Sequence, residues 1–108
     1  CLEPRERAAA DYLRGMGASG LGVEAAARTA AVLSTGAEGA IPLKEGYAAA
    51  MAAQNTSYAC VEKNIRSMVG KLQAGACGEY QALMGGLPAE RPSNELFLRR
   101  LARRILEW

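Results

Sequence analysis

The 108-residue sequence contains no histidine. The commonest general base near neutral pH is therefore missing, and so is the nitrogen ligand that most often joins cysteines in a zinc site. The phosphate-binding pattern GxxxxGK[ST] and the esterase pattern GxSxG are also absent. These absences argue against an enzyme, and we expect neither a cofactor nor a metal site.

Cysteines and long apolar runs are scarce as well. Cys1, Cys60 and Cys77 are an odd number and form no CxxC pair, so we expect reduced thiols and no intrachain disulfide. No basic start leads into an uninterrupted apolar stretch, and we therefore expect neither a signal peptide nor a membrane-spanning helix. The chain begins with Cys1 instead of Met, and we expect residues 1–108 to be a single cytoplasmic domain from a longer protein.

A pattern of β-strands is also missing, since no segment sustains an alternation of β-branched and polar residues. Alanine is abundant instead, and it favours helices that pack closely. Glycines and prolines divide the chain, and Gly46 is expected to interrupt the third of its segments. The pattern predicts an all-α fold of about six helices. The first two are expected over residues 4–16 and 22–35, and the third over 48–54, after a short turn of helix that begins at Pro42. The others are expected over 57–74 and 77–84, followed by a last helix capped by Ser93.

The segment from Ala52 to Leu72 is amphipathic. Its apolar residues recur at steps of three and four, which is the spacing of one helix face. The last helix has a similar stripe, so we expect the two stripes to be buried against each other: Tyr58, Val61, Ile65, Met68 and Leu72 against Phe97, Leu101 and Ile105. The opposite face of the first segment is polar.

Positive charge is concentrated in the second half of the chain. The net charge is only +2, but residues 60–108 hold eight Lys or Arg and five acids, whereas residues 1–59 hold five and six. Part of this charge lies on the last helix, at Arg99, Arg100, Arg103 and Arg104. We expect these four arginines to face solvent or to pair with Glu95 and Glu107.

The region around residue 55 combines a short helix, a tight polar turn and a longer amphipathic helix. Asn55 tolerates a left-handed backbone, and Thr56 or Ser57 can cap the next helix. Two helices joined in this way cross steeply, as in a helix-turn-helix, whose second helix lies in the major groove of DNA. The alternative is plain helix packing, because Asn55 replaces the usual turn glycine and the first helix is mostly alanine.

Two longer runs, KEGYAAAMAAQNTSYACVEKNIRSM and RPSNELFLRRLARRI, resemble the C-terminal DNA-binding domain of the sporulation stage-zero response regulators of Bacilli and Clostridia. The most specific parts are NTS with the following VE-basic-x-IR, and PSNELF in the last helix. The resemblance covers nearly the whole chain. It implies a six-helix bundle with a helix-turn-helix, attached behind a receiver domain, that binds a short DNA box and occupies tandem boxes as two copies.

The resemblance also assigns roles to residues of the second helix. Glu62, Lys63 and Arg66 match the acid, base and arginine of the family's recognition helix, and Thr56 and Ser57 match its polar start, which suits a phosphate. Ser67 completes this polar face. The sequence departs from the family at Ser67, where histidine is frequent, and lacks basic residues at Ala52, Ala53 and Cys60.

Two functions follow as expectations. The first is a sequence-specific DNA-binding transcription regulator whose partners are double-stranded DNA, a second copy of the domain on DNA, and RNA polymerase. The second is a helical protein-interaction module that kept the fold and lost DNA binding. Retention of Glu62, Lys63 and Arg66 favours the first function, and the weak net charge favours the second.

Overall fold

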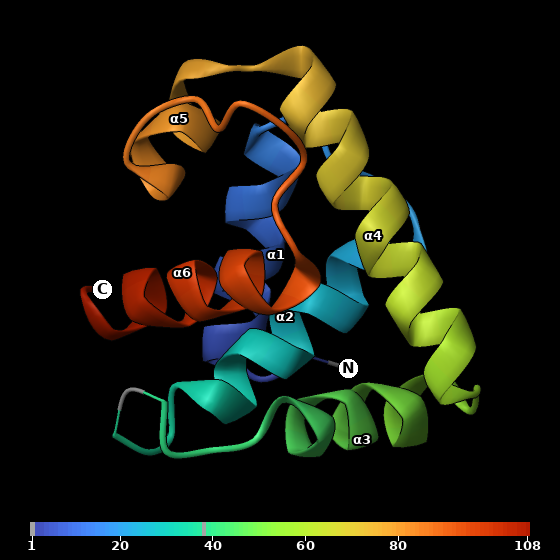
Figure 1. The fold of residues 1–108 in the computed structure, drawn as a ribbon. Coiled ribbons are helices and arrows are strands. Elements are labelled where there is room, and N and C mark those ends of the chain that lie inside the picture. Colours follow the sequence, from blue (N-terminus) through green and yellow to red (C-terminus); the bar gives the residue numbers. More distant parts are fainter. Residues whose placement is uncertain (1, 38) are drawn as a thin grey trace.

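Six α-helices, and no strand, make up the computed structural model over the residues that it describes, 2–37 and 39–108 (Figure 1). The all-α class and the number of helices predicted from the sequence are confirmed. The helices are α1 (Pro4–Gly15), α2 (Leu21–Leu33), α3 (Leu43–Gln54), α4 (Tyr58–Gly75), α5 (Gly78–Met84) and α6 (Asn94–Leu106).

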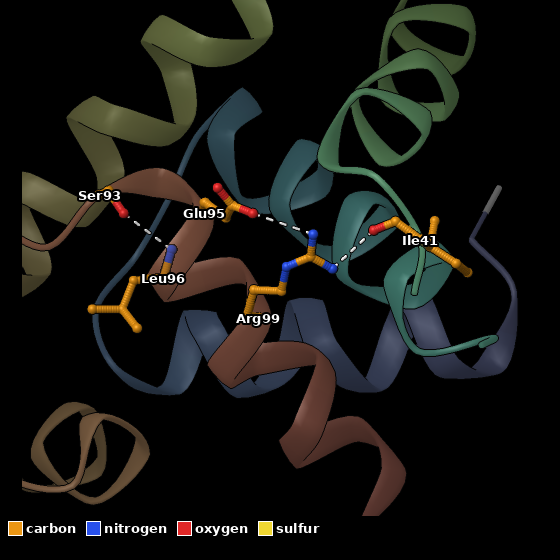
Figure 2. A network of polar contacts seen from close by, with 5 residues as sticks. All are labelled: Ile41, Ser93, Glu95, Leu96 and Arg99. Carbon is orange, nitrogen blue, oxygen red and sulfur yellow. Dashed lines mark hydrogen bonds and ion pairs between the residues drawn. The ribbon is translucent and has the colours of Figure 1, made fainter. Parts of the chain in front are cut away.

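The helix starts follow the capping residues of the sequence. Pro4 opens α1, where its missing amide proton costs nothing. The backbone amide of Cys60 donates to Ser57 Oγ (3.2 Å) at the start of α4. Likewise, the amide of Leu96 donates to Ser93 Oγ (3.1 Å) at the start of α6 (Figure 2). The predicted caps of these two helices are therefore confirmed.

Helix α2 forms the centre of the bundle and packs against α1, α3, α4 and α6 (Figure 1). Its buried side chains are mostly alanines, which let neighbouring helices approach closely. Gly46 on α3 continues this close packing: a Cβ there would lie 2.6 Å from Thr29 Cγ2, and the Thr29 hydroxyl donates to the Gly46 carbonyl (3.3 Å). The expectation that Gly46 breaks the third segment was wrong. The contact with α2 requires a glycine within one continuous helix.

The apolar stripes of α4 and α6 share one core. Val61, Ile65, Met68 and Leu72 are buried on α4, as predicted, and so are the three apolar residues expected opposite them on α6, Phe97, Leu101 and Ile105. Tyr58 is the exception, because its side chain is 46% exposed. It is the first residue of α4 and lies at the edge of the core, where its ring meets that of Tyr47 edge to face at 5.0 Å between centroids.

Arg99 and Arg104 of α6 take structural partners. Arg99 donates to the Ile41 carbonyl (2.9 Å) and pairs with Glu95 (3.2 Å), which ties the start of α6 to the loop before α3 (Figure 2). Arg104 pairs with Glu107 (3.7 Å). The predicted pairing with Glu95 and Glu107 is thus confirmed for Arg99 and Arg104.

Candidate nucleic-acid interface

A three-residue turn joins α3 to α4. Asn55 has the left-handed backbone that the sequence predicted (φ 51°), and its amide donates to the Met51 carbonyl. The amide of Thr56 donates to the same carbonyl (3.1 Å). Figure 1 shows α4 rising steeply from the end of α3 after this turn. The two helices therefore have the connectivity and the tight turn of a helix-turn-helix.

The six residues predicted to contact DNA lie along the turn and the first half of α4. Ser57, Lys63, Arg66 and Ser67 are exposed, whereas Thr56 and Glu62 are partly buried. Glu62 and Arg66, and likewise Lys63 and Ser67, are four residues apart and so adjoin on the helix surface. The structure brings the four predicted residues of α4 to the side that faces away from the core, and it places Thr56 and Ser57 in the turn before the helix.

Arg66 is paired weakly in the free protein. Its Nη1 lies 3.7 Å from Glu62 Oε1, and both side chains are close to half exposed. An exposed pair at this spacing contributes only about 0.3–0.5 kcal/mol, so Arg66 can exchange Glu62 for another acceptor at small cost. Lys63 has no ion pair with any residue in the described part of the chain. The face therefore offers two cations and one carboxylate to a ligand.

Cys60 lies on this exposed face of α4. Its side chain is exposed, and its pKa is lowered from the ordinary value of 9.0. The hydroxyls of Ser57 and Thr56, which hydrogen-bond the thiol, are the main cause, and the nearby Lys63 adds to the effect. Cys60 and Cys77 are both free thiols, and Cys1 lies outside the described residues.

We expect Cys60 to be alkylated faster than Cys77 in a Cys1→Ser variant. Cys60 is exposed and its lowered pKa enlarges the thiolate fraction near pH 7, whereas Cys77 is partly buried and its Sγ lies 3.8 Å from the Met16 carbonyl. Peptide mapping after short iodoacetamide pulses measures both rates, and Cys60→Ser should remove the fast reaction. Labelling of Cys77 first would contradict the prediction.

A groove runs along one side of α4, between that helix, the start of α3 and the start of α6. It is lined by Leu43, Tyr47, Tyr58, Glu62, Arg66, Arg91, Ser93, Asn94 and Glu95. Asn94, one of the lining residues, donates from Nδ2 to the Tyr47 hydroxyl (3.1 Å) and to the Glu62 carbonyl (3.1 Å). Burial raises the pKa of Tyr47, and the hydrogen bond from Asn94 opposes that rise. The start of α6 is thereby fixed against both helices of the helix-turn-helix.

A second groove lies on the other side of α4, against the start of α2. Its polar residues are Ser19 from the α1–α2 loop and Asn64, Ser67 and Lys71 from α4. The exposed face of α4 is thus bordered by two grooves, each with a cation near it, Arg91 or Lys71. Reasoning from sequence missed these two residues. Lys71 could have been found as the residue four positions after Ser67, but nothing in the sequence relates Arg91 to α4.

Other kinds of site receive little support. Within residues 2–37 and 39–108, no group of three or more Cys, Asp or Glu could hold a metal ion. The run from Gly15 to Gly20 has the spacing GxGxxG, but it begins at the last residue of α1, whereas the dinucleotide-binding fingerprint follows a strand. None of the helices in the described ranges has the length and apolarity needed to cross a membrane.

Comparison with known proteins finds no match, so the function has to be inferred from the candidate site. No family model, no curated protein and no solved structure matches the chain.

Proposed function

We propose that this chain is a sequence-specific DNA-binding domain that places α4 in the major groove. The observation that carries the proposal is the α3–turn–α4 unit, whose second helix exposes Lys63, Arg66 and Ser67 on the side away from the core. The resemblance of its sequence to the sporulation response regulators extends the proposal to a transcription regulator of that type, acting in the cytoplasm. Its partners would be double-stranded DNA, a second copy on tandem boxes, and RNA polymerase.

The dimensions and chemistry of α4 support this use. An α-helix with its side chains is about 10–12 Å across and fits the B-DNA major groove, which is about 12 Å wide. Arg66 supplies the fork that matches the O6 and N7 acceptors of guanine, and Glu62 can accept from the N4 amino group of cytosine. Ser57 and Thr56, at the start of the helix, provide hydroxyls for a phosphate.

The neutral residues on this surface predict moderate affinity. Ala52 and Ala53 are exposed near the end of α3, and Cys60 is exposed on α4, so no cation stands at any of these three positions. Each phosphate that a lysine or arginine neutralises adds to affinity by counterion release. We expect weaker binding, or a different box, than in a protein with a basic residue at all three positions.

A protein-interaction module is the second candidate, and the same surface favours it. Ala52, Ala53 and Tyr58 form an exposed, largely apolar border around the turn. The pairing of Arg66 with Glu62 also lowers the charge that the face presents. A partner helix or strand could pack on this border without nucleic acid.

Selection from a pool of randomised duplexes separates the two functions. The DNA-binding domain is expected to enrich one short box, with an affinity that falls steeply between two salt concentrations. Recovery of no preferred sequence, together with no salt-dependent retention of duplex, would favour the interaction module.

A further inference from the structure

The loop between α5 and α6 brings an arginine, Arg91, to the side of α4. Arg91 is exposed, and its Cδ lies 3.5 Å from the point where a Cβ on Gly70 would stand. The methylene stem of Arg91 therefore packs over the backbone of α4 at Gly70. Arg91 also lines the groove that Tyr58, Glu62 and Arg66 line.

Hydrogen bonds fix this loop to α4 on both sides of Arg91. Before it, Gln73 on α4 donates from Nε2 to the Pro88 carbonyl (2.6 Å), and Gln73 Oε1 accepts from the buried Tyr80 (2.6 Å). After it, Asn94 donates to the Glu62 carbonyl (3.1 Å). Arg91 is thus held at a defined place relative to the helix, although it is 25 residues from Arg66 in the sequence.

Of the two arginines that line the groove, Arg66 is paired and Arg91 is not, within residues 2–37 and 39–108. Glu62 is paired with Arg66 (3.7 Å) and Glu95 with Arg99 (3.2 Å). Arg91 forms no hydrogen bond or ion pair with any residue in the described part of the chain. In the free protein both carboxylates of the groove therefore pair with other arginines, and Arg91 is exposed.

We propose that Arg91 contacts a phosphate of the DNA strand that borders the major groove on the α6 side of α4. The inference rests on the proposed function, because a helix in the major groove has a phosphate backbone on either side of it. Contacts of this kind set the register and orientation of the helix and carry no sequence information. Arg91 is a positioning residue, and Arg66 reads the bases.

The test compares Arg91→Ala, Arg91→Lys and Arg5→Ala for binding to the selected duplex and to random duplex over a range of salt concentrations. Arg5 is an exposed arginine of α1 with no ion pair to a described residue, so its loss changes the net charge equally. Loss of one phosphate contact should weaken binding about fivefold to tenfold near 0.1 M salt, from a slope of roughly 0.9 per neutralised phosphate.

Arg91→Ala is expected to show this loss equally on both duplexes and to lower the salt slope by about one unit. Arg91→Lys should keep the slope, and Arg5→Ala should keep both slope and affinity. If wild-type protein binds while Arg91→Ala behaves like Arg5→Ala, or changes the preferred box, the role of Arg91 is refuted and the proposed function stands. If wild-type protein retains no duplex, both fail together.

Discussion

Replacing Gly22 with alanine is expected to destabilise the protein by about 1–3 kcal/mol, the usual cost of overpacking a tight interface. A Cβ at this position would lie 2.6 Å from the Asn64 carbonyl oxygen, 3.1 Å from its carbon and 3.2 Å from Met68 Cβ. Two of these atoms belong to the backbone of α4 and cannot rotate away. The substitution should therefore push α4 away from α2, and chemical denaturation measures the loss in free energy of unfolding.

Gly75→Ala is the matched control for this prediction. Gly75 is the last residue of α4, and a Cβ there would have no neighbour within 4 Å. Alanine at such a site should raise stability by about 0.4–1 kcal/mol, because it restricts the unfolded chain. Equal effects of the two substitutions would contradict the close approach of α2 to α4.

Arg66→Ala is expected to reduce discrimination between the selected box and random duplex by about 1–3 kcal/mol, the contribution of a bidentate arginine–guanine contact. The reason is its place on the exposed face of α4, one turn beyond Glu62 and adjacent to Lys63. Binding to random duplex should change much less. Competition titrations with the two duplexes measure the difference.

Arg14→Ala provides a control of similar exposure and pairing on another helix. Arg14 pairs with Asp11 on α1 at 3.5 Å, and its side chain is 48% exposed, compared with 49% for Arg66. It should leave the preference between duplexes unchanged. If Arg66→Ala also leaves it unchanged while the protein stays folded, α4 does not read DNA sequence.

Local signals in the sequence were sufficient for the helices and most of the core. The caps at Ser57 and Ser93 and the left-handed Asn55 depend on neighbouring residues only. Val61 and Ile65 are buried because the period of an amphipathic helix fixes which side meets the core. Tyr58 shares that period, but it lies at the first residue of α4, where the core ends.

Features that depend on distant segments could not be predicted. Gly46 indicated a helix break because glycine is a poor helix former, and only the presence of Thr29 opposite it explains a continuous α3. Arg91 reaches the candidate interface through a loop that Gln73 and Asn94 hold against α4. The sequence therefore predicted only the part of the candidate interface that lies on the turn and α4. The part contributed by the loop depends on contacts between residues 15 or more positions apart.

Mapping of backbone amide shifts on titration with the selected duplex tests the central claim most directly. Insertion of α4 into the major groove predicts large changes at residues 56–67, smaller ones around Arg91 and at the start of α2, and almost none on α1. Changes concentrated on α1 or on the outer side of α6, with α4 unaffected, would contradict the assignment of α4 as the helix that enters the groove.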